Sequence, residues 1–94
     1  MFENNADIEH KKTILLKAIG KVVYQQRKLL KKGINKFSFE YDIGNGLLSR
    51  LENGTSDTKI TTLWKLANAF NMTFAEFACL IEKELPADFN FYDD

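Results

Sequence analysis

Apolar residues recur along the chain at intervals of three and four, which is the spacing of one face of an α-helix. The first such stripe runs from about residue 10 to residue 32, with most of its lysines on the other faces. Two lysines followed by Gly33 are typical of a helix C-terminus, so we expect this helix to end there. The stripe consists of Ile14, Leu15, Ala18, Ile19, Val22, Val23, Leu29 and Leu30.

Shorter helices are predicted beyond Gly33. Thr73 and Glu76 have the spacing of a capping box and open the last of these helices, which Pro86 ends. The alternation in the stretch FSFEY also permits a strand, but the stretch is short and has no nearby pairing partner. The predicted helices cover residues 34–42, 44–52, 58–71 and 73–85.

The same spacing assigns the side chains that should lie inside. Arg50 is expected to point outward, whereas Trp64 shares a face with core residues and is expected in the core rather than on a stacking surface. Cys79 should be a small buried hydrophobe, because no histidine or acid is placed to activate its thiol. The inward faces consist of Leu47, Leu48 and Leu51 in the third helix and of Ile60, Leu63, Trp64, Ala67 and Phe70 in the fourth.

We therefore expect an all-α fold in which residues 1–94 form a single domain. Its helical core should cover residues 10–85, and residues 86–94 form a tail rich in acids and aromatics. No apolar run approaches the length of about 18 residues that a membrane-spanning helix needs, so no membrane association is expected. A single cysteine cannot form an internal disulfide, which fits the reducing cytoplasm.

Charge is distributed unevenly along a chain whose formal net charge is zero. Residues 11–50 carry ten Lys/Arg against two acids, while residues 51–94 carry eight acids against three lysines. A basic first half could hold a polyanion on one face. The same charges could equally be the solvated faces of ordinary helices.

The stretch DIGNGLLSRLENG, residues 42–54, is the candidate functional segment. It lacks the GxxxxGK[ST] or GxGxxG pattern that a nucleotide-binding loop places after a strand. It also lacks the alternating acids and final glutamate of a calcium loop. No nucleophile–base pair, carboxylate dyad or metal-ligand cluster is recognisable elsewhere, so we expect neither catalysis nor a metal or other cofactor. A short helix, a tight turn and a second helix with a small, polar start remain, and this arrangement is a helix-turn-helix.

Three segments carry a resemblance to a known family: IGKVVYQQRKLLKKG in the first helix, SRLENG at the end of the third, and TLWKLANAFNMTFAEF across the fourth and fifth. Over roughly residues 19–78 the chain resembles the phage-repressor and Cro-like (XRE-type) helix-turn-helix transcriptional regulators. The resemblance implies a five-helix lambda-repressor-like fold. It also implies an ion pair between Arg27 and Glu52, which would fix the first helix to the motif. Without that pairing, the two residues would be unrelated surface charges.

The resemblance further implies which residues face DNA. The base-facing positions fall at the start of the third helix and one turn further along. Arg50 suits guanine or a phosphate, and Asn45 could read adenine or cap the helix. Lysines that flank the motif are expected at phosphates, although solubility alone could account for them. The candidate DNA-binding residues are Asn45, Gly46, Leu47, Arg50, Lys28, Lys31, Lys32 and Lys36.

Three positions depart from the family pattern. Gly46 removes a base-reading side chain and weakens its helix by roughly 0.5–1 kcal/mol, although it allows close approach of the backbone to a phosphate. Asp42 replaces the usual glycine of the turn; it tolerates left-handed φ but adds negative charge near the groove. Ser38 replaces a usual alanine and is still small enough for close packing. We therefore expect modest direct readout, with DNA shape and phosphate positioning contributing to specificity.

The favoured function is a DNA-binding transcriptional regulator, in the form of a repressor that binds double-stranded operator DNA as a homodimer. The dimer surface could come from the fifth helix and the tail, unless their aromatics cover the chain's own core. An alternative is an antitoxin or other protein-interaction module on the same fold, with a partner at the tail of residues 86–94. A further alternative is a domain that keeps the fold but has lost DNA binding.

Overall fold

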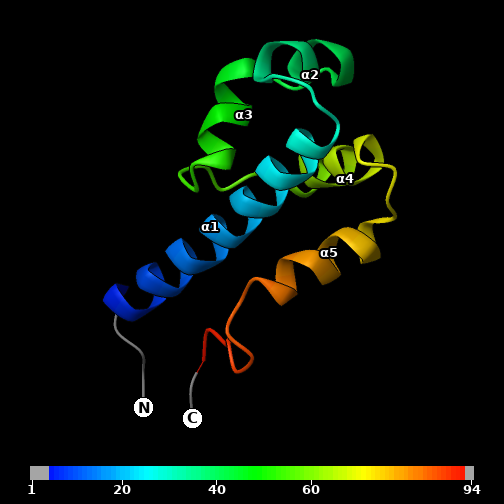
Figure 1. Ribbon diagram of the computed structural model, residues 1–94. Coiled ribbons are helices and arrows are strands. Elements are labelled where there is room, and N and C mark those ends of the chain that lie inside the picture. The colour runs from blue at the N-terminus through cyan, green and yellow to red at the C-terminus, as the bar shows by residue number, and fades with distance from the viewer. Residues whose placement is uncertain (1–4, 93–94) are drawn as a thin grey trace.

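The computed structural model describes residues 5–92, and this part of the chain contains helices and no strand, as predicted. The long helix α1 forms the spine of the fold. Helices α2 and α3 pack at its C-terminal end, and α4 and α5 complete the other side (Figure 1). The helices are α1 (Asn5–Leu29), α2 (Ile34–Tyr41), α3 (Asn45–Glu52), α4 (Ile60–Ala69) and α5 (Phe74–Lys83).

Helix α1 differs from the prediction at both ends. It begins at Asn5 rather than near residue 10. It ends at Leu29, two residues before Lys31, whose φ of 58° is left-handed. Gly33 does not end α1; it is the extended N-cap of α2. The expectation that Leu29 and Leu30 belong to the buried stripe was wrong, because Leu29 lies on the side of α1 opposite the buried Arg27 and Leu30 follows the end of the helix. Leu29 is 72% exposed.

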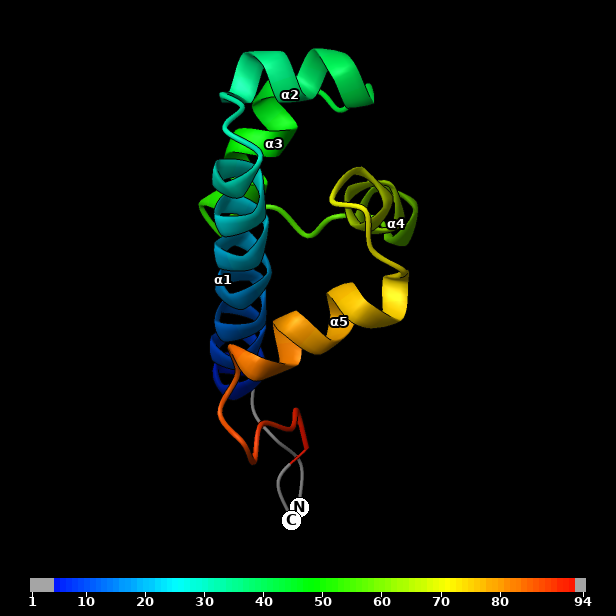
Figure 2. The ribbon, with the colours of Figure 1, turned by 45° about the vertical axis from the view of Figure 1, so that its right-hand side comes forward.

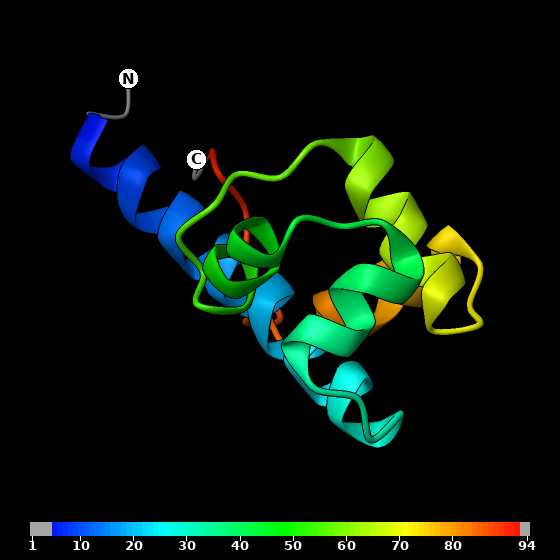
Figure 3. The same cartoon turned by 90° about the horizontal axis from the view of Figure 1, so that it is seen from above.

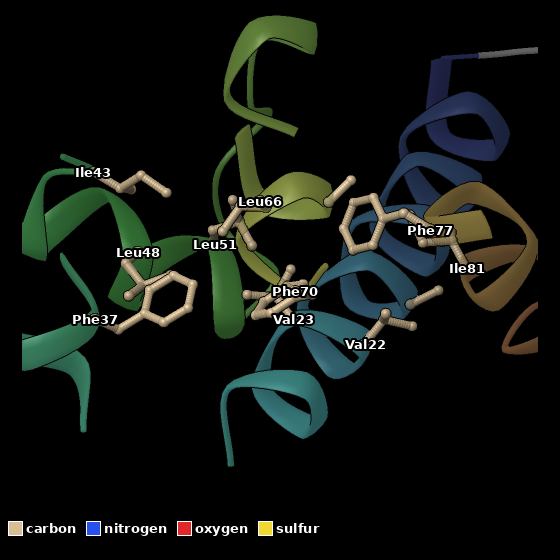
Figure 4. Packing of buried hydrophobic residues seen from close by; sticks show 12 residues of the cluster. Val22, Val23, Phe37, Ile43, Leu48, Leu51, Leu66, Phe70, Phe77 and Ile81 are labelled. Atoms are coloured by element: carbon tan, nitrogen blue, oxygen red, sulfur yellow. The ribbon is translucent and has the colours of Figure 1, made fainter. Parts of the chain in front are cut away.

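The core lies between α1 and the other four helices (Figure 4). Phe70 of α4 is at its centre, with ring centroids 5.4 Å from Phe37 of α2 and 6.1 Å from Phe77 of α5. Both Phe37 and Phe77 are fully buried. One aromatic row therefore joins three helices that are distant in sequence. The buried apolar residues are Ala18, Val22, Val23, Phe37, Ile43, Leu48, Leu51, Leu66, Ala67, Phe70, Phe77 and Ile81.

The buried face of α4 consists of other residues than the sequence predicted. Leu66 is fully buried, whereas Ile60 and Trp64 are 56% and 52% exposed, so the expectation that both belong to the core was wrong. The cause is that Leu63, Leu66, Ala67 and Phe70, at i, i+3, i+4 and i+7, form the inward stripe instead. The Trp64 ring stacks on Phe74 at 4.8 Å with its edge in solvent.

Helix α5 opens with the predicted capping box. The Thr73 hydroxyl accepts from the Glu76 N–H at 3.1 Å, and the Glu76 carboxylate accepts from the Thr73 N–H at 2.8 Å. Phe77 and Ile81 form its buried face. The predicted burial of Cys79 was wrong: it lies off this face and its thiol is exposed.

The tail folds back on α1. The Lys11 ammonium donates to the Phe91 carbonyl at 3.1 Å, and Lys21 pairs with Glu84 at 2.9 Å. Phe89 and Phe91 are half-buried, and their rings meet edge-on at 5.5 Å. These aromatics therefore cover the chain's own surface, although Tyr92 remains exposed.

The backbones of α1 and the end of α3 approach each other closely (Figure 3). A Cβ added to Gly20 would lie 2.5 Å from the Leu51 carbonyl oxygen and 2.6 Å from the Glu52 carbonyl oxygen. A Cβ added to Gly54, whose φ is 74°, would lie 2.7 Å from the Cγ of Lys17. Only glycine leaves room for the α3 carbonyls to rest on α1.

We expect Gly20→Ala to destabilise the protein by about 1–3 kcal/mol, because the methyl group would overlap backbone atoms that cannot rotate away. Helix propensity alone would predict the opposite change in stability, because it favours alanine over glycine. Urea denaturation followed by circular dichroism measures the change in the free energy of unfolding. Gly46→Ala is the matched control: its Cβ would meet only the flexible end of Arg50, at 3.1 Å, and stability should stay level or rise. Equal effects of both changes would contradict the packing explanation.

Ser38 offers a second stability test. It is 7% exposed, and its hydroxyl finds no hydrogen-bond partner among the described residues. A buried hydroxyl without a partner costs about 1–3 kcal/mol, so Ser38→Ala should raise the free energy of unfolding by about 1 kcal/mol. Thermal and urea unfolding of the two proteins measure the difference. A loss of stability would show that the hydroxyl does have a partner in solution.

Candidate nucleic-acid interface

The link between α2 and α3 is a tight turn that exposes the start of α3. Asp42 ends α2 in the left-handed region, with φ and ψ of 53°, and the Ile43 N–H donates to the Ser38 carbonyl at 3.1 Å. The Ile43 side chain is buried and anchors the turn to the core. On α3, Leu48 and Leu51 face inward. The polar start of α3 therefore projects away from the core.

A buried ion pair fixes α3 to the end of α1. Arg27 donates from Nε to Glu52 Oε2 at 2.7 Å and from Nη2 to Oε1 at 2.8 Å, and both side chains are less than a tenth exposed. Its Nη1 also donates to the Lys32 carbonyl at 2.8 Å. The hydrogen bonds to Glu52 raise the pKa of Arg27 above its ordinary value, against the opposing effect of burial. The ion pair implied by the sequence resemblance is thus present.

Asn45 is the first residue of α3, and its side chain is held from α2. Its Nδ2 donates to Oδ1 of Asn35 at 2.6 Å, and both residues are exposed. The suggestion that Asn45 caps α3 was wrong: the N-cap is Gly44, and no side chain caps that end. Sequence reasoning missed Asn35. The motif register brings it beside Asn45, but nothing in the local pattern of α2 marks it.

The Arg50 guanidinium folds back along α3 toward its N-terminus. A Cβ on Gly46 would lie 3.1 Å from Arg50 Nη1, so the glycine leaves the space that the guanidinium occupies. Arg50 is exposed, and no ion pair forms to it within residues 5–92. Leu47 is half-buried and packs on the core, which leaves less of it to face a groove.

The lysines that flank the motif differ in whether they form ion pairs with other described residues. Lys32 pairs with Glu40 at 2.6 Å and lies 5.1 Å from the centre of the Tyr41 ring. The hydrogen bond between Lys32 and Glu40 raises the pKa of Lys32 and lowers the pKa of Glu40. The pair therefore persists at neutral pH and is lost as the pH falls through the lowered pKa of Glu40. Lys28, Lys31 and Lys36 are exposed and form no ion pair with a described residue.

One lysine that the sequence did not single out reaches the turn. Lys65 of α4 donates from Nζ to the Asp42 carbonyl at 2.7 Å, across a separation of 23 residues. It places a positive charge at the C-terminal end of α2, where the helix dipole favours cations, and beside the acidic residue that replaces the family glycine. No local sequence signal points to Lys65, because the contact exists only in the folded chain.

Asn45 and Gly46 thus lie at the exposed start of α3, and the guanidinium of Arg50, from the last turn of α3, reaches back to Gly46. Lys31 and Lys36 lie on the adjoining loop and α2, and Lys28 lies in the last turn of α1. Within the described residues, no group of His, Cys, Asp and Glu side chains could hold a metal ion. None of the helices described is long and apolar enough to cross a membrane.

A comparison with protein families matches residues 23–77 to the family described as helix-turn-helix. The matched segment runs from the last third of α1 to the first turn of α5 and includes the whole motif. The chain belongs to this family, the XRE-type helix-turn-helix proteins, and is a DNA-binding helix-turn-helix regulator with a lambda-repressor-like fold. Neither a curated protein nor a solved structure shows significant similarity to the chain.

We expect Glu52→Ala to lower the free energy of unfolding by about 3–5 kcal/mol, because it strands the Arg27 cation in a buried site. Chemical denaturation measures the loss. Glu40→Ala, which removes the acid of the exposed pair with Lys32, is the control and should leave the unfolding midpoint nearly unchanged. A small effect at Glu52 would mean that the Arg27 site is hydrated and is not a structural anchor.

Proposed function

We propose that the chain is a transcriptional repressor that binds operator DNA as a homodimer in the cytoplasm, with α3 in the major groove. The observation that carries this proposal is the exposed face of α3, on which Asn45 and Arg50 lie outside the core. Exposed lysines that form no ion pair with a described residue lie on the adjoining elements. The Arg27–Glu52 pair holds α3 in a fixed place relative to α1. The free thiol of Cys79 fits a reducing compartment.

Each residue has a distinct proposed role. Arg50 donates to O6 and N7 of guanine or to a phosphate, and Asn45, held by Asn35, contacts an adjacent base. Gly46 contributes no side chain and brings the α3 backbone close to the DNA. Leu47 gives at most an apolar edge to the groove. The proposed phosphate contacts are Lys28, Lys31 and Lys36, with a smaller contribution from Lys32 because Glu40 neutralises part of its charge.

The proposed division between base contacts and phosphate contacts predicts how the protein selects its DNA site. Two polar side chains on the exposed face of α3 can discriminate few base pairs directly, since each good bidentate contact contributes about 1–3 kcal/mol. Phosphate contacts position the protein without reading sequence. The proposed regulator therefore obtains part of its selectivity from the shape and deformability of its operator.

The alternative of an antitoxin or interaction module depends on a tail that is free to dock on a partner. In this chain Phe89 and Phe91 are half-buried, and Lys11 holds the Phe91 carbonyl. Most of the apolar surface of the tail is therefore already engaged by the protein itself. A tail partner remains a prediction, and the repressor is the better supported function.

The test is fluorescence anisotropy with a mixed-sequence 30-base-pair duplex at several salt concentrations. Binding should weaken steeply as salt rises, and Arg50→Ala should weaken it further by about tenfold or more, because a charge-assisted contact is lost. Asp42→Asn should instead tighten binding, since it removes a negative charge near the phosphates and keeps a residue that tolerates left-handed φ.

Lys17→Ala is the matched control for charge, because Lys17 is exposed in the first half of α1. That half of α1 lies away from α2 (Figure 2). Lys17→Ala should change the affinity much less than Arg50→Ala. If binding is absent even at low salt, the helix-turn-helix serves another purpose and the proposal fails. If binding is present but Lys17→Ala and Arg50→Ala weaken it equally, α3 is not the reading element.

A further inference from the structure

The dipeptide Asn-Gly occurs twice in residues 42–54, as Asn45–Gly46 at the start of α3 and as Asn53–Gly54 directly after its end. An asparagine side chain is open to attack by the backbone nitrogen of the next residue, and a glycine there places no side chain in the way. The attack closes an imide ring and releases ammonia, and water then opens the ring to aspartate or isoaspartate. Because both sites are Asn-Gly, a large difference in their reactivity would come from the fold.

The backbone nitrogen of Gly46 is not part of the hydrogen-bonding pattern of α3. The first backbone hydrogen bond of α3 runs from the Leu48 N–H to the Gly44 carbonyl at 2.9 Å, so the Gly46 N–H precedes that pattern. No described side chain caps this end of the helix, and Asn45 and Gly46 are both exposed. The end of a helix also opens at little cost in free energy. The Gly46 nitrogen can thus reach the side-chain amide of Asn45 once a single exposed turn opens.

A cation lies beside the same nitrogen. A Cβ on Gly46 would lie 3.1 Å from Arg50 Nη1, which places the guanidinium next to the Gly46 backbone. Arg50 forms no ion pair with a described residue, so its charge is not neutralised there. The reactive form of the amide nitrogen is its anion, and a nearby positive charge favours the anion. The position of Arg50 therefore promotes attack by the Gly46 nitrogen.

The second Asn-Gly is protected by the same fold. The Gly54 N–H donates to the Leu51 carbonyl at 3.0 Å, and Gly54 is buried. A Cβ on Gly54 would lie 2.7 Å from Lys17 Cγ, so the backbone at this point rests against α1. The Gly54 nitrogen must lose its buried hydrogen bond before it can attack, which costs free energy. Asn53 is therefore an internal control for Asn45.

We infer that Asn45 is a site of spontaneous deamidation, through which the folded protein loses DNA affinity with time. In the reaction the Gly46 nitrogen gives up its proton and bonds to Cγ of Asn45, and the bond from Cγ to Nδ2 breaks. The departing nitrogen takes up the proton and leaves as ammonia. Water then adds to one carbonyl of the imide and opens the ring, which leaves a carboxylate in place of the amide.

The modification changes the chemistry of the start of α3. The Asn45 Nδ2 donor, which now binds Asn35 Oδ1 at 2.6 Å, is replaced by an acceptor that carries a negative charge. A carboxylate cannot donate to a base and is repelled by the phosphates. Bound DNA would cover the site and slow the reaction there. The loss of affinity rests on the proposed function, whereas the reaction at Asn45 does not depend on it.

Mass spectrometry of tryptic peptides, after incubation of the folded protein at mildly alkaline pH, tests the inference. Cleavage after Arg50 places the two asparagines in different peptides, and deamidation adds one mass unit to either. Asn45 should be modified about tenfold faster than Asn53 or more, because the Gly54 nitrogen must first lose its hydrogen bond. In concentrated urea the two rates should become similar. Gly46→Ala is the matched variant: it should slow the reaction at Asn45 and leave Asn53 unchanged.

The outcomes separate the modification from the proposed function. Equal rates in the folded protein, faster modification of Asn53, or an unchanged rate at Asn45 in Gly46→Ala would each overturn the site. Asn45→Asp, measured by anisotropy with the duplex, should bind about tenfold more weakly than the unmodified protein, because it adds a negative charge at the phosphates. Equal affinity would overturn the loss of DNA binding. A protein that deamidates at Asn45 but never binds the duplex would contradict the proposed function and leave the modification site standing.

Discussion

The approach of α3 to α1 is the contact on which the rest of the fold depends. The carbonyls of Leu51 and Glu52 rest on the bare backbone of Gly20, and the Glu52 carboxylate binds Arg27 two turns further along α1. Together these contacts set both the distance and the rotation of α3. Helix α2 is joined to α3 by a tight turn, so the position of α2 follows from that of α3. The exposed end of the motif is thus located by interactions at its opposite, buried end.

Periodicity alone predicted the number and type of helices, because amphipathic spacing reflects burial directly. It failed where burial depends on which neighbours are present. The last turn of α1 reads as apolar, yet Leu29 has nothing to pack against. On α4 a stripe that includes Trp64 and one that includes Leu66 fit the spacing almost equally well. Only the row from Phe37 to Phe77 selects the second stripe.

The site was predictable to the extent that a family pattern could be matched position by position. The match gave Asn45, Arg50 and the Arg27–Glu52 pair. It could not give Asn35 or Lys65, since both depend on side chains that meet across helices. Lys65 and Arg50 help to explain two of the departures from the family pattern. Lys65 supplies a cation at the turn where Asp42 replaces glycine, and Gly46 frees the volume that the Arg50 guanidinium fills.

The buried Arg27–Glu52 pair separates two uses of charge within one small domain. An arginine stays protonated at any physiological pH, and a pair removed from water is little affected by dissolved ions. The lysines around α3 stand in solvent, where counterions compete with them directly. On the proposed DNA-binding role, a rise in salt concentration would therefore release the protein from the polyanion while leaving its framework unchanged. The molecule that dissociates is already folded in its binding geometry and can bind again without refolding.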